Sequence, residues 1–230
     1  MSHVGRLIAS ATALALALLA FATVPAAAAD TADQQRMVDE ARKTLQNFEA
    51  DQDMEWFPSR LKETKAILII PRLLKAAFIV GLEGGGGVML ARDEETGKWS
   101  NPAFYTMISG SFGLQAGVQW PEMILVVRTK KGLDSLLTSS FKLGADVSFA
   151  VGPVGAGAKL KTADIYAYSR AQGIFAGISL DGSVISTRDK WNSAYYDKPG
   201  VKPLDILVLR NVSNKKAEPL VETLDKATKQ

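Results

Sequence analysis

Four basic residues surround a dense apolar run, and this part of the sequence has the residue types best suited to binding chemistry. Lys62 and Lys65 precede the run 66–70, and Arg72 and Lys75 follow it. Leu61, Leu68 or Leu73 could enter the interface of a bilayer while the flanking cations meet lipid phosphates. The pattern alone leaves two interpretations open: contact with an anionic phospholipid membrane surface through these four residues, or a core strand with solvated flanks.

Two further groups of charged residues are weaker candidates. Asp181, Asp189 and Asp197 offer the oxygen ligands that a hard cation such as calcium prefers, but their spacing fits no known calcium loop. We expect them to lie in solvated turns. The basic residues within 128–131 are expected at a solvated strand end, and a contribution to an anionic-lipid patch is the alternative.

Aromatic residues gather toward the C-terminal end of the sequence. They are Tyr166, Tyr168, Trp191, Tyr195 and Tyr196. Aromatic rings contribute large apolar areas to protein cores, and they also form belts at lipid interfaces. We favour packing as the role of this group and keep the interfacial belt as the alternative.

The N-terminal segment has the three parts of a secretory signal. Arg6 supplies a positive start, an apolar run extends over residues 7–24, and the small residues Ala27 and Ala29 close the segment. We therefore predict a signal peptide over residues 1–29 and a periplasmic or secreted protein that associates peripherally with membranes. A retained anchor is the alternative, because the run approaches the ~20 residues that a membrane span needs.

The composition excludes several kinds of chemistry. The chain has no Cys and a single His, His3, which lies in the predicted signal peptide. Disulfides, zinc sites built on Cys or His, and Ser-His-Asp catalysis are therefore excluded. The formal net charge of +3 is too small for a general nucleic-acid binder. We expect a protein that is not an enzyme and that uses no cofactor or metal.

After the signal peptide, the sequence predicts an amphipathic helix over residues 30–52 and a single domain over residues 53–230. The apolar positions of the helix recur at helical spacing. They are Met37, Ala41, Leu45 and Phe48. Short apolar runs separated by turn residues then predict strands, among them 206–209. Asp181-Gly182 predicts a hairpin between the runs 174–180 and 184–186.

Glycine clusters are frequent between and within these runs. Gly84–Gly87 lacks the Lys-Ser/Thr pair of a phosphate-binding loop and precedes a strand-like run rather than a helix. We interpret these glycines as sites of bending or close backbone packing within strands. The predicted fold is α+β, with a multistranded antiparallel, glycine-rich sheet or partly closed barrel, the N-terminal amphipathic helix and short flanking helices.

Several groups of residues, in this order, resemble the SYLF domain, also called the actin-patch lipid-binding domain. They are residues 62–81, residues 84–92 with Trp99-Ser100-x-Pro102, Tyr166-Ala-Tyr-Ser169 with residues 173–182, and Asn192-x-x-Tyr195-Tyr196. The resemblance extends over most of the sequence, from about residue 53 to residue 196.

The resemblance implies a lipid-binding domain without enzymatic activity. Lys62 and Lys65 fall in the basic, amphipathic region that contacts lipid in eukaryotic members of the family, and Arg72 and Lys75 fall close to it. Some of those members also bind actin, which an exported protein does not meet. We therefore expect a general anionic phospholipid as the ligand. A cell-envelope structural module that binds protein or glycan, including an envelope protein partner, is the alternative.

Overall fold

The computed structural model describes residues 26–52, 57–77, 80–112, 117–119, 121–151, 162–171, 174–175 and 180–229. Residues 1–25, most of the predicted signal peptide, lie outside these ranges. The helices are α2 (Ala26–Glu49), α3 (Phe57–Leu61), α4 (Lys130–Leu136), α6 (Asp189–Tyr195), α7 (Pro203–Leu207), the 3-10 helix η2 (Lys215–Ala217) and α8 (Glu218–Lys229). The strands are β1 (Ala66–Ile70), β2 (Leu74–Ala77), β3 (Val80–Ala91), β4 (Ala103–Phe112), β5 (Gly117–Gln119), β6 (Glu122–Val127), β7 (Ser140–Lys142), β8 (Phe149–Val151), β9 (Ile165–Ala171), β10 (Ile174–Phe175) and β11 (Val184–Thr187).

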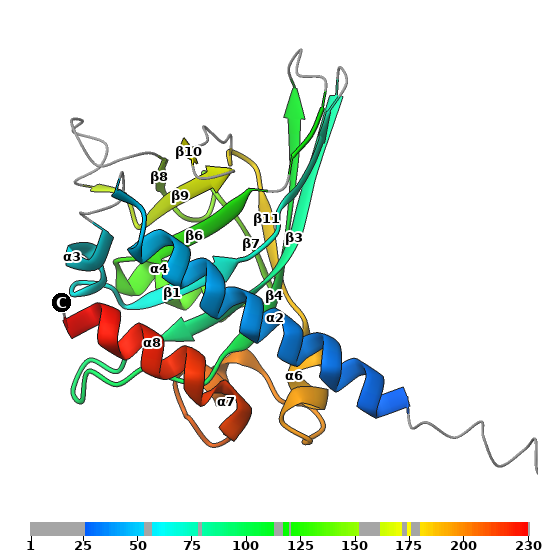
Figure 1. Cartoon of the computed structure of the whole chain (residues 1–230), viewed down its shortest axis with the longest axis vertical. Coiled ribbons are helices and arrows are strands. Elements are labelled where there is room, and N and C mark those ends of the chain that lie inside the picture. The colour runs from blue at the N-terminus through cyan, green and yellow to red at the C-terminus, as the bar shows by residue number, and fades with distance from the viewer. Residues whose placement is uncertain are drawn as a thin grey trace, which may run out of the picture.

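The strands form one curled sheet, a half-barrel that is antiparallel in almost all its pairings (Figure 1). Within the described ranges the sheet has eleven strands, eight of them in the order β10-β9-β6-β1-β3-β4-β11-β7. Strand β8 pairs in parallel with β9. The predicted α+β class and the partly closed antiparallel sheet are confirmed.

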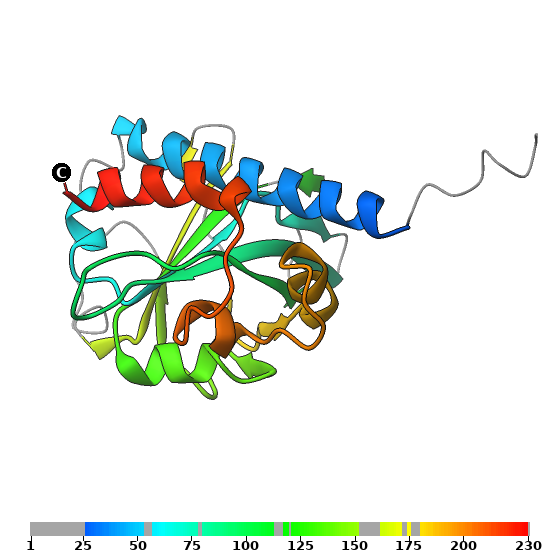
Figure 2. The ribbon, with the colours of Figure 1, turned by 90° about the horizontal axis from the view of Figure 1, so that it is seen from below.

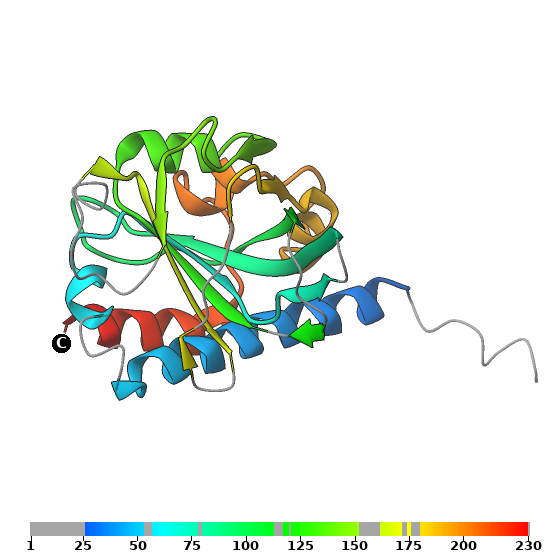
Figure 3. The same ribbon diagram turned by 90° about the horizontal axis from the view of Figure 1, so that it is seen from above.

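Helices cover both faces of this sheet. Figures 2 and 3 show α2 and α8 side by side across one face, with α4 and α7 on the opposite face. The predicted apolar stripe of α2 faces the sheet, since Ala41, Leu45 and Phe48 are fully buried and Met37 packs against the same core. No helix in the part of the chain that the structure describes is long and apolar enough to cross a bilayer.

Strand residues alternate between two apolar cores. Val88, Leu90 and Phe104 point to the core beneath α2 and α8, whereas Met89 and Tyr105 point to the core beneath α4 and α7. Burying one such side chain stabilises a fold by about 1.5–3 kcal/mol. Because both faces are buried, a shift of one residue in strand pairing would move every side chain into the wrong core.

Strand β3 pairs with two successive strands along its length. Its residues from Val88 onward pair with β1, and residues 81–84 pair with β2. Between the pairs Ile69–Val88 and Leu74–Gly84, four residues of one strand path lie opposite three of the other, which is a β-bulge. Pro71 lies in this bulge, a position that tolerates proline because no ladder hydrogen bond needs its missing N–H.

The glycine run of β3 lies directly opposite the bulge, where backbones approach closely. A Cβ atom at Gly85 would lie 2.5 Å from the carbonyl oxygen of Arg72, and one at Gly87 would lie 2.6 Å from that of Ile69. Real Cβ atoms do not approach other atoms this closely, so these two positions require glycine. The structural interpretation of the glycine run is confirmed.

Strands β5 and β6 follow one another past Pro121, as β2 and β1 do past Pro71. The four-stranded ribbon β6-β1-β3-β4 therefore continues as β5-β2-β3-β4. We call this continuation the distal sheet and define it as β2, β5, residues 80–84 and residues 108–112. Figure 1 shows it rising away from the layer of helices.

Two sequence-based expectations were wrong. The run 206–209 was expected to be a strand, but the helix α7 covers residues 203–207. Pro203 favours the helix because its fixed φ suits a first helical turn. A short apolar run by itself does not distinguish a helix from a strand. The Asp181-Gly182 turn exists, with a φ of 76° at Gly182, but it joins no hairpin. Strand β11 pairs with β4 on one side and β7 on the other, and β10 pairs with β9, so neither edge of β11 is free for β10; residues 176–179 of the expected hairpin lie outside the described residues.

The close approach at Gly87 yields a stability prediction. We expect Gly87→Ala to lower the free energy of unfolding by about 1–3 kcal/mol, because its methyl group overpacks a rigid backbone. Gly110→Ala is the matched control, since a Cβ there meets nothing within 4 Å, and we expect a change of less than about 0.5 kcal/mol. Urea denaturation of both variants measures the difference, and equal midpoints would contradict the argument.

Candidate functional site

The four basic residues predicted to bind lipid lie at two ends of one buried strand. Lys62 and Lys65 precede β1, and Arg72 and Lys75 follow it. Because an extended chain rises about 3.3 Å per residue, Lys65 and Arg72 are separated by roughly 20 Å. The structure therefore does not bring the four residues into one site, and each end of β1 has its own surroundings.

The Lys62 end of β1 opens into a cavity of about 300 Å³. Its lining combines three cations with three carboxylates, contributed by Lys62, Lys65, Arg92, Glu63, Asp93 and Glu94. Lys65 forms an ion pair with Glu94. Lys62 is exposed, and no ion pair joins it to another of the described residues. The charges of this cavity nearly cancel, so it offers little net attraction to an anion.

Arg92 holds the two walls of this cavity together. Its Nη1 donates to the carbonyl oxygen of Lys62 at 2.7 Å, and its Nε donates to that of Gly97 at 3.1 Å. Arg92 thereby links the chain before β1 to the turn between β3 and β4. This residue was not predicted as important from the sequence, because its role depends on two segments about thirty residues apart.

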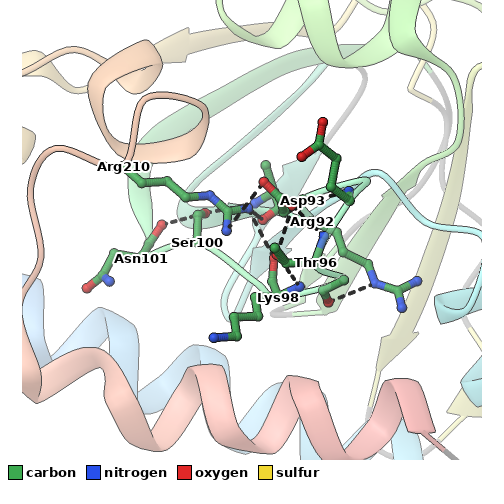
Figure 4. A network of polar contacts seen from close by, with 10 residues as sticks. Arg92, Asp93, Thr96, Lys98, Ser100, Asn101 and Arg210 are labelled. Atoms are coloured by element: carbon green, nitrogen blue, oxygen red, sulfur yellow. Dashed lines mark hydrogen bonds and ion pairs between the residues drawn. The ribbon is translucent and has the colours of Figure 1, made fainter.

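The turn after Arg92 is a network of polar contacts (Figure 4). The carboxylate of Asp93 accepts hydrogen bonds from the Thr96 N–H at 2.7 Å and from the Thr96 hydroxyl at 2.8 Å. These bonds from the Thr96 backbone and side chain are the main causes that hold the pKa of Asp93 below its usual range, with the nearby Arg210 guanidinium also lowering it. Arg210 Nη2 also donates to the Lys98 carbonyl oxygen at 3.1 Å. Asp93 is therefore an ionised, structural member of the turn.

The Arg72 end of β1 has a different character. The expectation that Leu61, Leu68 or Leu73 enters a lipid interface was wrong, because all three side chains are buried in the core. The Arg72 and Leu74 side chains, which flank Leu73, are exposed. The Arg72 side chain is 69% exposed, and its Nη2 lies 3.5 Å from the Glu40 carboxylate, longer than the 2.7–2.9 Å typical of a charge-assisted hydrogen bond. A cation and an apolar side chain thus lie next to one another, both facing solvent.

Lys75 lies in β2, opposite Glu83 of β3 and Gln119 of β5. Successive positions of a strand face opposite sides of a sheet, so the position of Lys75 faces away from that of Leu74. Its side chain lies outside the described part of the structure. The register therefore separates Lys75 from the face that carries Leu74.

Of the other charged candidates, Asp181 and Asp197 are exposed, whereas Asp189 and the basic residues within 128–131 have partners. Asp189 forms an ion pair with Lys202, and Asp197 lies in a turn with a φ of 47°. Among the described residues, no three carboxylate or imidazole side chains gather in a way that could hold a metal ion. In the segment 128–131, the Arg128 guanidinium lies 4.6 Å from the ring centroid of Tyr166, and Lys130 pairs with Asp134 at 3.0 Å.

The aromatic group packs within the fold, as favoured from the sequence. Tyr166, Tyr168 and Tyr195 are buried, and Phe104 contacts both Trp191 and Tyr195 edge to face. Burial raises the pKa of Tyr168 and of Tyr195 above the ordinary value. These rings are therefore core and helix-packing residues rather than an interfacial belt.

One buried carboxylate lies on the face of the sheet covered by α4. Asp164 accepts hydrogen bonds from the hydroxyls of Thr129 and Ser148, both at 2.6 Å. Burial alone would raise the pKa of Asp164, but these hydrogen bonds outweigh it and the net shift is downward. Asp164 thus joins α4 to β9 as a fully engaged ion and does not resemble a catalytic acid.

Comparison with known proteins assigns the chain to a family. The family described as "Ysc84: Las17-binding protein actin regulator" matches residues 108–227, just over half of the 230 residues. The chain therefore belongs to the Ysc84 family, the family of SYLF domains, which confirms the resemblance found in the sequence.

Curated relatives of the chain include yeast and human proteins. LAS seventeen-binding protein 3 of Saccharomyces cerevisiae is 33% identical over 162 residues, which cover 67% of this chain and 34% of the yeast protein. SH3 domain-containing YSC84-like protein 1 of Homo sapiens is 29% identical over 167 residues, 70% of this chain and 48% of the human protein. The chain thus spans about a third to a half of the length of these relatives.

Several residues that carried the resemblance have framework roles. The Asn192 Oδ1 accepts a hydrogen bond from the buried N–H of Phe104 at 2.8 Å, and the Tyr196 hydroxyl donates to the Pro102 carbonyl oxygen at 2.6 Å. The Trp99 Nε1 donates to the Thr228 hydroxyl at 3.1 Å. These contacts fix α6 to the start of β4 and α8 to the segment between β3 and β4. These residues therefore maintain the fold.

Proposed function

We propose that this protein binds membranes that contain anionic phospholipid and that the Arg72 end of β1 makes the contact. The observation that carries the proposal is the exposed pair Arg72 and Leu74 on either side of the buried Leu73. A guanidinium presents several donors to phosphate oxygens, while a neighbouring leucine can enter the interface. The Lys62 end is less suitable, because its cations face an equal number of carboxylates.

The same proposal describes a peripheral binding protein rather than an enzyme. Asp164, the buried carboxylate, is occupied by structural hydrogen bonds, and Asp93 belongs to a turn. The protein has no cysteine, and its single histidine is His3. A protein that binds lipid headgroups needs only cations and an apolar surface, and the proposal includes no cofactor or metal.

A second candidate function is supported by an apolar patch on and after α7. Leu204, Val208 and Leu209 are 44%, 46% and 58% exposed. Val208 also lines a depression of about 180 Å³ together with Leu133 and Arg210. Two relatives are named for binding Las17 or for an SH3 domain, which supports a protein partner in general. For this protein the candidate is an envelope protein that covers the exposed apolar side chains of the patch. Leu209→Asp would then abolish partner cross-linking in cells while leaving vesicle binding unchanged.

We also propose that the protein is exported after removal of residues 1–29. The charged start, the apolar run and the small residues before Asp30 support this proposal. Mass spectrometry of the protein from cell-envelope fractions should find an N-terminus at Asp30. Ala29→Leu should leave an unprocessed chain, because the peptidase needs a small residue there. An intact N-terminus in the wild-type protein would contradict the proposal.

Charge-reversal variants test the lipid proposal by co-sedimentation with phosphatidylcholine vesicles, with and without phosphatidylglycerol. Because one cation near an anionic surface contributes about 1 kcal/mol, we expect Arg72→Glu to weaken binding to anionic vesicles at least about fivefold. Lys62→Glu tests the other end of β1. Lys142→Glu is the matched control, since Lys142 is exposed on β7 at the far end of the strand order.

The outcomes distinguish the two ends of β1. The proposal expects Lys62→Glu and Lys142→Glu to change binding less than about twofold, and Arg72→Lys to retain most of it. A loss with Lys62→Glu but not with Arg72→Glu would move the site to the cavity beside Arg92. Absence of binding to either kind of vesicle would contradict the lipid function itself.

A further inference from the structure

The register of the distal sheet sorts its residues by polarity. Leu74, Gly84 and Ile108 lie directly opposite one another on β2, β3 and β4, so these three positions share one face. Leu74 is 38% exposed and Ile108 is 53% exposed. Because Gly84 has no side chain, the two apolar side chains flank an open strip of backbone.

The next rows of the same face are equally apolar. Ala76 lies opposite Leu82 of β3 and Val118 of β5, and Leu82 lies opposite Gly110 of β4. Val80 and Phe112 form the last row. Every position that the register assigns to this face is therefore an aliphatic residue, a phenylalanine or a glycine. We call it the apolar face of the distal sheet.

The opposite face carries the polar positions. Lys75 lies opposite Glu83, and Glu83 lies opposite Ser109. Ser109 is buried and faces away from Ile108. The polar side chains of the distal sheet thus all lie on this face, together with Ala77, Gly81 and Gly117, and none lies on the apolar face. Adjacent exposed apolar side chains such as Leu74 and Ile108 are typical of an interaction surface.

Cations lie at the base of the apolar face. Arg72 precedes Leu74 and is largely exposed. A Cβ at Gly86, one alternation closer to the helices than Gly84, would lie 3.2 Å from Nη1 of Arg188. An apolar surface that ends in guanidinium groups matches the boundary between acyl chains and phosphates, where long basic side chains place their charge at the headgroups.

We infer that the apolar face of the distal sheet inserts into the acyl layer of a membrane, with Arg72 and Arg188 at the phosphate level. This inference deepens the proposed lipid function and rests on it. Lipid is favoured over a second copy of the chain as the partner of this face. The cations Arg72 and Arg188 suit lipid phosphates, whereas two copies facing each other would bring like charges together. The inserted sheet would add an apolar contribution to the binding free energy, which salt does not screen.

The absence of cysteine from the chain allows a direct test. Ile108→Cys, labelled with an environment-sensitive fluorophore, should shift its emission to the blue on anionic vesicles, and nitroxides on the lipid acyl chains should quench it. Leu204→Cys is the matched control, because Leu204 is 44% exposed on α7 and should show neither change. Ile108→Asn should weaken the binding that remains at high salt about tenfold, since burial of an aliphatic side chain is lost.

The outcomes separate the insertion from the lipid function. Vesicle binding with a blue-shifted, quenched label at residue 108 supports both. Vesicle binding with an unquenched label at residue 108 overturns the insertion and leaves the headgroup contact intact, whereas failure to bind any vesicle overturns both. A blue shift that grows with protein concentration in the absence of lipid would overturn the insertion in favour of a second copy.

Discussion

The architecture depends on one backbone constraint, the close passage of β3 beneath the chain that joins β1 to β2. The space for a Cβ atom is taken at Gly85 by the carbonyl oxygen of Arg72 in that chain and at Gly87 by the carbonyl oxygen of Ile69 near the end of β1. The bulge at Pro71 lies at the same level and inserts one extra residue into the path. A bulged strand bends, so the ribbon leaves the layer of helices at this level and continues as the distal sheet.

This bend divides one continuous sheet into a part that is packed between helices and a part that is exposed. On the main part, helices bury both faces, and residues such as Asn192 and Trp99 fix those helices by hydrogen bonds from buried groups. Beyond the bend, Leu74 and Ile108 are exposed although both belong to the same strand system. The same strands thus combine a packed frame with an exposed apolar surface at Leu74 and Ile108.

The bulge also explains which parts of the site could be predicted from the sequence. The strand 66–70, the buried stripe of α2 and the structural role of the glycines follow from local patterns, and all three predictions are confirmed. The grouping of Lys62, Lys65, Arg72 and Lys75 does not follow, because β1 holds the two pairs far apart and the register turns Lys75 away from Leu74. Ile108 was missed for a related reason: it lies opposite Gly84 only through pairing between strands, which no local pattern reveals. The same limit applies to the Asp181-Gly182 turn, which indicates a reversal of the chain but not the partner of the next strand.

Hydrogen exchange of the protein with and without anionic vesicles distinguishes membrane contact through the distal sheet from contact through the cavity beside Arg92. Contact through the distal sheet should slow amide exchange on vesicles in residues 74–77 and 106–112 and leave exchange in residues 92–98 unchanged. Slower exchange confined to residues 62–65 and 92–98, with the distal sheet unaffected, would contradict contact through the distal sheet.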